Sequence, residues 1–155
     1  MSHSRPFSIC QLTPIDVTLM EAMLTNFGEA FGELDTYTEA RPSADYLERL
    51  LGSKHFIALA ALKDDTVVGG LTAYELQKPE RERGEIYVYD LAVATAHRRQ
   101  GIATALIEEL KTIAGTRGAY VIFVQADCGD APAIALYSKL GTRAEVLHFD
   151  IKIGE

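Results

Sequence analysis

The sequence predicts a single α/β domain (α+β in the broader sense) with a central mixed β-sheet flanked by about four helices. Apolar, β-prone runs alternate with segments in which apolar residues recur every three or four positions. The composition is typical of a globular protein, with 48% hydrophobic and 24% charged residues. A chain of 155 residues is long enough for one core. We therefore expect one domain over residues 1–155, with the element order β-α-α-β-β-β-α-β-α-β.

The first part of the chain predicts a strand and two helices. Residues 7–12 alternate apolar and polar side chains, as in a half-buried strand. A Thr-Pro pair begins the first helix, which carries a 3.6-residue apolar period over residues 13–27. Two Phe-Gly pairs at 27–32 predict a bent helix end or a loop. The second helix is expected over residues 41–52, where a glycine ends it.

The middle of the chain predicts a hairpin. Strands are expected at 55–63 and 66–76, joined by a turn at Asp64 and Asp65. The adjacent glycines at 69–70 indicate a bulge or a close backbone approach. A charged loop at 77–84 then leads to the next strand.

The last part predicts strands and helices in alternation, which is typical of a parallel crossover. The expected elements are a strand at 85–93, a helix at 101–116, a strand at 119–126, a helix at 131–141 and a final strand at 143–153.

The charge balance disfavours a nucleic-acid-binding protein. Fifteen Lys and Arg residues face 22 Asp and Glu residues, a formal net charge of −7 that suits a cationic partner. No apolar run approaches the ~20 residues of a membrane span. The N-terminus lacks the apolar core of a signal peptide, so we expect a cytoplasmic protein with no membrane partner. Cys10 and Cys128 have no metal-ligand spacing, and no metal is expected.

The first chemical motif follows strand 85–93. Arg98-Arg99-Gln100-Gly101-Ile102-Ala103 joins that strand to a helix, and its glycine lets a ligand approach the backbone. Unpaired N–H groups at a helix start and the helix dipole favour an anion such as a pyrophosphate. On its own the hexapeptide fits an ordinary strand-to-helix turn better than it fits a ligand site. The Gly-Lys-Ser/Thr of a nucleoside-triphosphate loop is missing.

The second motif is the helix sequence at 133–141, AIALYSKLG. Tyr137 has helical spacing to Ala133, Ile134 and Leu140, so it is either a core tyrosine or a positioned acid. A phenol can protonate a departing thiolate.

Together the two motifs resemble the GCN5-related N-acetyltransferase (GNAT) superfamily, over essentially the whole chain. Segments including EIYVYDLAV, HRRQGIATALI, FGEAFGELDTY, ALYSKLG and HFDI further resemble the gentamicin-type aminoglycoside 3-N-acetyltransferases. The resemblance implies a GNAT fold, acetyl-CoA as cosubstrate, a cationic aminoglycoside as acceptor and acetylation at position 3 of its 2-deoxystreptamine ring, which gives antibiotic resistance. The family also allows a homodimer, although the sequence shows no interface signal.

The resemblance also implies where acetyl-CoA binds. Strand 85–93 would splay from strand 119–126, and pantetheine would pair with the exposed backbone as an added strand. A backbone N–H there would polarise the acetyl carbonyl. The implied cofactor-binding residues are Leu91, Ala92, Val93, Arg98, Arg99, Gln100, Gly101, Ile102, Ala103 and Thr104. The resemblance also implies that Tyr137 is the general acid that protonates the CoA thiolate.

Asp90 is the predicted catalytic base. A substrate amine is largely protonated at neutral pH, and a carboxylate beside the thioester can accept its proton. Strict alternation would place Asp90 on the face of Ile86 and Val88, where an unpaired carboxylate is costly. Either a bulge turns it or a cationic substrate pairs with it; alternatively it accepts backbone N–H bonds at a strand irregularity.

Further acidic residues are candidates for holding a polycation. Asp127 and Asp130 follow the end of a parallel strand, where ligands of open sheets bind, although Asp130 is also placed to cap the next helix. The other candidates are Glu85, Glu33, Asp35, Asp150 and Glu29, although charges of this kind are usually just solvated. We expect structural roles for His97 and His148.

Two alternative functions stay open at this stage. The same fold acetylates other small cationic amines, such as polyamines and peptide amines. A non-catalytic acyl-CoA-sensing module would need the cofactor turn but not the tyrosine.

Overall fold

The computed structural model describes residues 6–154, and the chain divides after Gln125 into two compact units. The first holds a five-stranded sheet and most of the helices, and the second holds one helix and the C-terminal segment.

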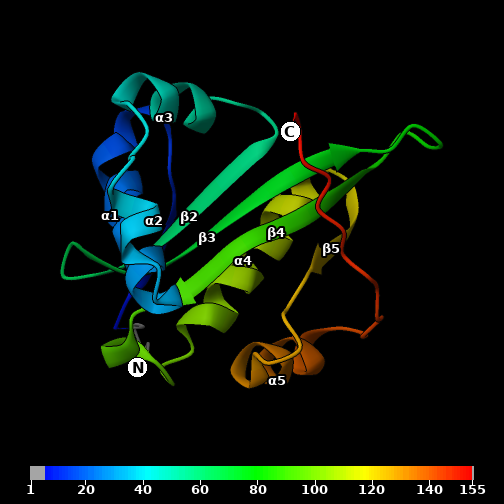
Figure 1. Cartoon of the computed structure of the whole chain (residues 1–155). Coiled ribbons are helices and arrows are strands. Elements are labelled where there is room, and N and C mark those ends of the chain that lie inside the picture. The colour runs from blue at the N-terminus through cyan, green and yellow to red at the C-terminus, as the bar shows by residue number, and fades with distance from the viewer. Residues whose placement is uncertain (1–5, 155) are drawn as a thin grey trace. The chain divides into compact units, whose positions relative to one another are not determined.

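The sheet of the first unit is mixed, as expected, and its strands lie side by side in chain order (Figure 1). The first three pairings are antiparallel, and the last pairing is parallel. The strands are β1 (Ser8–Gln11), β2 (Phe56–Lys63), β3 (Thr66–Gln77), β4 (Gly84–Val93) and β5 (Ala119–Val124).

The helices of this unit include one that was not expected. They are α1 (Val17–Phe31), α2 (Leu34–Thr38), α3 (Ala44–Leu51) and α4 (Ile102–Thr116), with 3-10 turns at Pro14–Asp16 and Thr95–His97. Gly32 ends α1 with φ of +68°, a left-handed conformation that favours glycine. The chain then turns back as the short helix α2, where the sequence predicted only a bent end or a loop.

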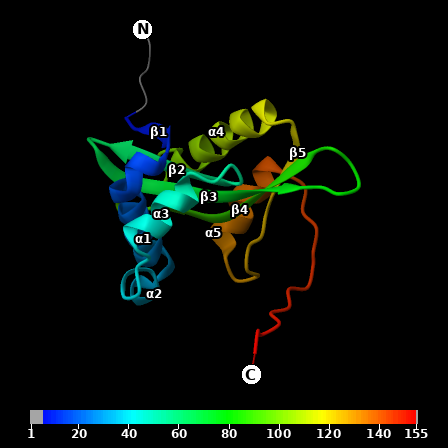
Figure 2. The ribbon, with the colours of Figure 1, turned by 90° about the horizontal axis from the view of Figure 1, so that it is seen from above.

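The helices cover opposite faces of the sheet. Figure 2 shows α4 on one side and α1 with α3 on the other. Alternation along the strands assigns side chains to these faces. A Cβ placed at Gly69 would lie 3.1 Å from Ile102 Cγ2 of α4, and one at Gly70 would lie 2.7 Å from Met23 Cε of α1. This close approach on both faces confirms the prediction made from the two glycines.

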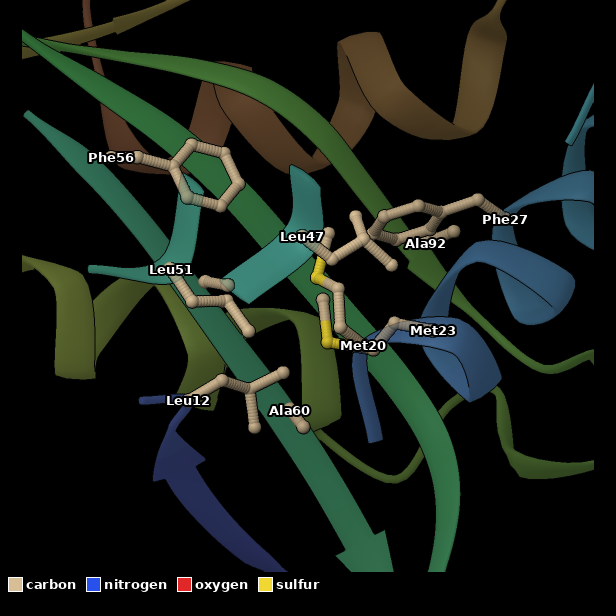
Figure 3. Close-up of a cluster of buried hydrophobic side chains, with 10 residues drawn as sticks. Leu12, Met20, Met23, Phe27, Leu47, Leu51, Phe56, Ala60 and Ala92 are labelled. Atoms are coloured by element: carbon tan, nitrogen blue, oxygen red, sulfur yellow. The ribbon is translucent and has the colours of Figure 1, made fainter. Parts of the chain in front are cut away.

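The face under α1 and α3 has its own hydrophobic cluster, drawn in Figure 3. Met23 and Phe27 of α1 are fully buried there against alternate residues of β2 and against Leu47 of α3. Burying a side chain of this size stabilises the fold by about 1.5–3 kcal/mol. The cluster comprises Leu12, Met20, Met23, Phe27, Leu47, Leu51, Phe56, Ala58, Ala60 and Ala92.

The second unit contains α5 (Ala131–Leu140), which begins with Pro132 in its first turn, as predicted. The final strand predicted over residues 143–153 is not formed, and that segment has no regular secondary structure. Its alternating side chains fit a strand, but a strand also needs a neighbour that completes its backbone hydrogen bonds, and alternation does not supply one.

Within residues 6–154, none of the helices combines the length and the hydrophobicity of a membrane-spanning segment.

Candidate active site

A β-bulge at Tyr89 determines which way Asp90 points. In the ladder between β3 and β4, Thr72 pairs with Asp90 and Ala73 pairs with Val88, so Tyr89 is the extra residue. One extra residue shifts the alternation of a strand by one position. Asp90 therefore faces the α1 side of the sheet, opposite to the α4 side on which Val88 is buried. Of the two possibilities raised by the sequence, the bulge is present.

Two hydroxyl groups hold the Asp90 carboxylate. Thr72 Oγ1 donates to Asp90 Oδ2 at 2.9 Å, and Tyr37 Oη donates to Asp90 Oδ1 at 3.4 Å. Thr72 is buried, with 4% of its surface exposed, whereas Asp90 is half-buried. Burial raises the pKa of the Asp90 carboxyl above its ordinary value, and the two donors, which favour the ionised form, offset part of that rise.

The Asp90 carboxylate has no cationic partner among the residues that the structure describes. A half-buried carboxylate without a counter-charge is costly, and a cation arriving from outside would relieve that cost. The arrangement therefore fits a positively charged ligand.

Asp90 lines a cavity of about 280 Å³ between α1, α2, α3 and the sheet. Aromatic side chains form much of its wall, and Asp90 is its acidic group among the described residues. Aromatic rings attract cations through their electron-rich faces. The cavity is lined by Met20, Leu24, Thr36, Tyr37, Ala40, Pro42, Tyr46, Leu47, Leu50, Phe56, Thr72, Tyr74, Tyr89 and Asp90.

The aromatic wall continues across the same face of the sheet. Tyr89 contacts Tyr74 and Tyr87 edge-on, with ring centroids 5.9 and 6.0 Å apart. Tyr87 stacks on Phe123 at 4.7 Å, and its hydroxyl donates to Gln125 Oε1 at 2.9 Å. These contacts give the face a rigid, mostly apolar surface with hydroxyl groups at its edge.

Next to Asp90, β4 loses its parallel neighbour. The pairing between β4 and β5 runs from Gly84 opposite Ala119 to Val88 opposite Val124 and extends no further. Residues 90–93 therefore pair with β3 on one side, while the outer edge of residues 89–93 has no strand partner within residues 6–125. An unpaired strand edge is a template for an extended ligand.

The turn that follows β4 has the backbone geometry of an anion site. Arg99 has φ of +63° and Gly101 has φ of +80°, and α4 begins directly after this pair of left-handed residues. Ala105 N–H bonds to the Gly101 carbonyl, while the N–H groups of residues 102–104 have no backbone partner among the described residues. Arg98 Nε donates to the Val93 carbonyl at 3.4 Å. Such a strained turn at a helix start favours a bound anion.

In the second unit, Tyr137 lies on α5 and is half-buried. Burial first, and then the charge of Asp130, raise the pKa of Tyr137 to about 12, so its hydroxyl keeps its proton at neutral pH. Asp130 caps α5 by accepting from Ala133 N–H at 3.2 Å, the structural role that the sequence offered for it. Asp127 carries an exposed side chain, and Asp150 Oδ1 lies 2.9 Å from His148 Nε2, from which it can accept a hydrogen bond.

The remaining acidic candidates lie in the first unit. Glu85 pairs with Lys78, with 3.0 Å between carboxylate and ammonium, so its charge is already compensated. Glu33 is the N-cap residue of α2 and Asp35 lies in its first turn, both exposed near the rim residues Thr36 and Tyr37. Glu29 is exposed on α1.

Tyr37 and Thr72 are site residues that the sequence did not predict. Thr72 lies in a strand that looks ordinary, and its role depends on register. Tyr37 belongs to the unexpected helix α2. The repeated Phe-Gly pairs at 27–32 were the available signal, because glycines at that spacing mark a turn with a close helix contact.

Within residues 6–154, no three His, Cys, Asp or Glu side chains gather in a way that would hold a metal ion.

The family model described as "Acetyltransferase (GNAT) family" matches residues 19–142. Among curated proteins, N-acetyltransferase 8B of Rattus norvegicus is 28% identical over 98 residues, which are 63% of this chain and 44% of that protein. The matched part thus spans less than half the length of that relative.

Two solved structures cover nearly the whole chain. An aminoglycoside acetyltransferase from an uncultured soil metagenomic sample is 62% identical, covers 99% of this chain and 100% of its own, and has a TM-score of 0.94. A second soil metagenomic aminoglycoside acetyltransferase, solved in complex with sisomicin, is 29% identical, covers 96% and 97%, and has a TM-score of 0.88.

Proposed function

Because the chain belongs to the acetyltransferase (GNAT) family, we propose that it transfers the acetyl group of acetyl-CoA to an amine of an aminoglycoside. The family uses acetyl-CoA as its acetyl donor. The observation that carries the choice of acceptor is the Asp90 carboxylate, which lies in a tyrosine-lined cavity with no counter-charge among the described residues. The 62% identity to an aminoglycoside acetyltransferase supports the same choice.

In this proposal, acetyl-CoA binds along β4 and the turn after it. The unpaired outer edge of Leu91, Ala92 and Val93 receives pantetheine, and a backbone N–H there polarises the acetyl carbonyl. The pyrophosphate binds the start of α4, through Arg98, Arg99, Gln100, Gly101, Ile102, Ala103 and Thr104. The left-handed residues of the turn and the free N–H groups of the first helical turn support this assignment.

Asp90 is the base of the proposed reaction. The substrate ammonium loses a proton to the carboxylate, directly or through water, and the free amine attacks the thioester carbon. The new C–N bond forms, the C–S bond breaks, and the electron pair leaves on sulfur. The raised pKa of Asp90 suits this role, because a stronger base accepts the proton more readily.

Tyr137 is the proposed acid that protonates the CoA thiolate. With its pKa raised to about 12, the phenol holds its proton firmly, so we expect the transfer to accompany cleavage of the C–S bond. Tyr137→Phe should slow the acetyl-transfer step about a hundredfold in single-turnover kinetics, at the lower end of what a positioned acid contributes. An unchanged single-turnover rate would remove Tyr137 from the mechanism.

The remaining ammonium groups of the substrate need further carboxylates. Glu33 and Asp35 are the favoured candidates in the first unit because they lie at the start of α2, which lines the cavity. Asp127, Asp130 and Asp150 are the candidates in the second unit. Glu85 is the least favoured, since Lys78 already compensates its charge.

The proposed acetylation site is position 3 of the 2-deoxystreptamine ring, and the product structure tests it. The enzyme is incubated with acetyl-CoA and gentamicin, and the acetylated nitrogen is located by NMR. Acetylation at N3 supports the proposal, whereas a product acetylated elsewhere corrects the ring position.

Parallel initial-rate assays with kanamycin, spermidine and amino-acid amides distinguish the acceptor classes. Faster turnover of spermidine or an amide than of any aminoglycoside would favour a different small cationic amine. Thermal stabilisation by acetyl-CoA without thiol release toward any amine would favour a sensing module.

A further inference from the structure

We propose that Tyr37 and Thr72 are positioning residues that fix the Asp90 carboxylate in its catalytic orientation, and that the glycine turn between α1 and α2 exists to bring Tyr37 there. The proposal rests on the proposed function in one respect, namely that Asp90 acts as the base. Tyr37 and Thr72 act on the reaction through Asp90.

The two donors bind different oxygens of the same carboxylate. Thr72 approaches Oδ2 from β3, the strand directly paired with Asp90, and Tyr37 approaches Oδ1 from α2. A carboxylate bound at both oxygens from two elements is held in one rotamer, which is the requirement for a base that must meet an amine at a defined position.

The position of Tyr37 depends on a glycine in α1. A Cβ added at Gly28 would lie 2.9 Å from Leu34 Cα and 3.1 Å from Tyr37 Cβ. Contacts below 3.0 Å to a backbone atom are sterically excluded, so α2 packs this closely only against glycine. Gly32, in its left-handed conformation, makes the turn that returns α2 to α1.

Aromatic packing fixes the Tyr37 ring once α2 is in place. The ring contacts Phe27 edge-on, with centroids 6.3 Å apart, and Phe31 at 6.0 Å. The hydroxyl is therefore carried on a ring that is oriented by its neighbours, and the ring would stay in place if the hydroxyl were removed.

The groups that face Asp90 within residues 6–125 are hydroxyls rather than cations. Tyr37 of α2, Tyr74 of β3 and Tyr87 of β4 each interact with its charge. Tyr89 and, from α3, Tyr46 share its cavity, and Glu33 acts on Tyr37. The pKa of Tyr37 is raised to about 12, chiefly by burial and by the Asp90 charge, so Tyr37 stays a donor throughout the working range of pH.

Removing either donor should therefore make Asp90 harder to ionise. A donor to a carboxylate favours its charged form, and its loss shifts the pKa of Asp90 further upward. The acid limb of the pH profile of kcat/KM should move to higher pH, giving a several-fold loss on the acid side.

The experiment measures the Asp90 carboxyl directly and then the activity. Carbon-13 NMR titration of carboxyl-labelled protein follows Asp90 in the wild type, Tyr37→Phe and Thr72→Val, with Asp90→Asn assigning the signal. Tyr46→Phe is the matched control, because it removes a tyrosine hydroxyl from the same cavity that makes no hydrogen bond to Asp90 among those described. Thr72→Ser should restore the wild-type midpoint by returning the hydroxyl.

Upward midpoints in Tyr37→Phe and Thr72→Val, with unshifted Tyr46→Phe and Thr72→Ser, support the proposal. An Asp90 midpoint that does not move in either variant overturns it. Gly28→Ala tests whether the close packing of α2 on α1 positions Tyr37. It should reproduce the shift of Tyr37→Phe if the turn positions the tyrosine, and an unshifted midpoint in a folded Gly28→Ala protein removes that part.

The NMR titration separates this proposal from the proposed function. It needs no substrate, so the effect of the Tyr37 and Thr72 hydrogen bonds on Asp90 is tested even if no aminoglycoside is acetylated. Conversely, if Asp90→Asn acetylates gentamicin at the wild-type rate while the titration shows the shifts, Tyr37 and Thr72 hold Asp90 without positioning a catalytic base, and the catalytic part of the proposal is overturned.

Discussion

The two faces of the sheet in residues 6–125 differ in what they bury. On the α4 side, fully buried aliphatic residues such as Leu71, Ile86 and Leu106 meet, and the carboxylate of Glu75 on this face is paired with Arg117 at 3.2 Å. On the α1 side, an apolar cluster gives way toward the end of β4 to Asp90, Thr72 and a cavity lined by tyrosines. The same strands supply both faces.

This difference shows how one sheet separates stability from recognition. The closed α4 face contributes packing energy, whereas the open end of the α1 face holds a carboxylate that has no cationic partner within residues 6–154, at a cost in stability. Mutations on the first face should change folding and leave the chemistry alone, and mutations at the second should do the reverse.

Loss of the Asp90 carboxylate should give the largest effect on activity of all the changes to either face. Asp90→Ala and Asp90→Asn should lower kcat about a thousandfold, since a positioned base contributes about 10²–10⁴-fold. Acetyl-CoA affinity, measured by calorimetry, should change little. Near-wild-type turnover in both variants would show that the open face does not supply the base.

A cavity on the closed face should give the next largest effect. Leu106 is fully buried, and Leu106→Ala should lower the free energy of unfolding by about 3 kcal/mol, because burial is lost and a void remains. Urea titration measures it, with the exposed Glu108→Ala on the same helix as a control expected within about 0.5 kcal/mol. A fall in kcat of the folded Leu106→Ala protein as large as that of Asp90→Ala would contradict the separation of the two faces.

Glycines at opposite ends of α4 separate an effect on acetyl-CoA binding from an effect on stability within one helix. Gly101→Ala places a Cβ in a left-handed position and should cost about 1 kcal/mol while weakening acetyl-CoA binding. Gly115→Ala lies in the helix with open space around it, and should stabilise by up to about 1 kcal/mol without changing acetyl-CoA binding. Equal effects of the two changes on acetyl-CoA affinity would disprove the role of the turn.

The smallest effect concerns the cost of the Asp90 charge. The pKa of Asp90 is raised in the folded state, so its ionised form destabilises the fold. This destabilisation develops as the pH rises from the pKa of the unfolded chain to that of the folded protein, and it is complete above the latter. Asp90→Asn, which carries no charge, should therefore show a slightly higher Tm than the wild type at neutral pH and no advantage in acid. Calorimetric scans across pH check this, and a lower Tm at neutral pH would mean that the carboxylate is compensated.

The sequence predicted most elements because their signals are local. Hydrophobic periods located the helices and strands within a few residues, and the turn at Arg98–Gly101 was recognisable from its glycine and basic residues. Asp90 stood out as a lone carboxylate in an apolar run. The final strand failed because strand formation depends on a partner, and α2 was missed because five residues are too few to show a period.

The bulge was partly visible in advance. Ile86 and Val88 occupy even positions of β4, whereas Leu91 and Val93 occupy odd ones, and both pairs face α4 through the register with β3. A change of apolar parity within one strand indicates an extra residue. What the sequence did not contain was the partner of the bulge, since Thr72 meets Asp90 only in the folded ladder.

The bulge at Tyr89 also has a consequence for comparing related sequences. Since Thr72 pairs with Asp90 and Ala73 with Val88, a chain lacking the residue at position 89 would have an unbroken ladder with its carboxylate on the same face. In such a relative the base would stand immediately after the equivalent of Val88, and an alignment without a gap would pair Asp90 with the wrong residue. The functional position is thus defined by its cross-strand neighbour rather than by its distance along the chain.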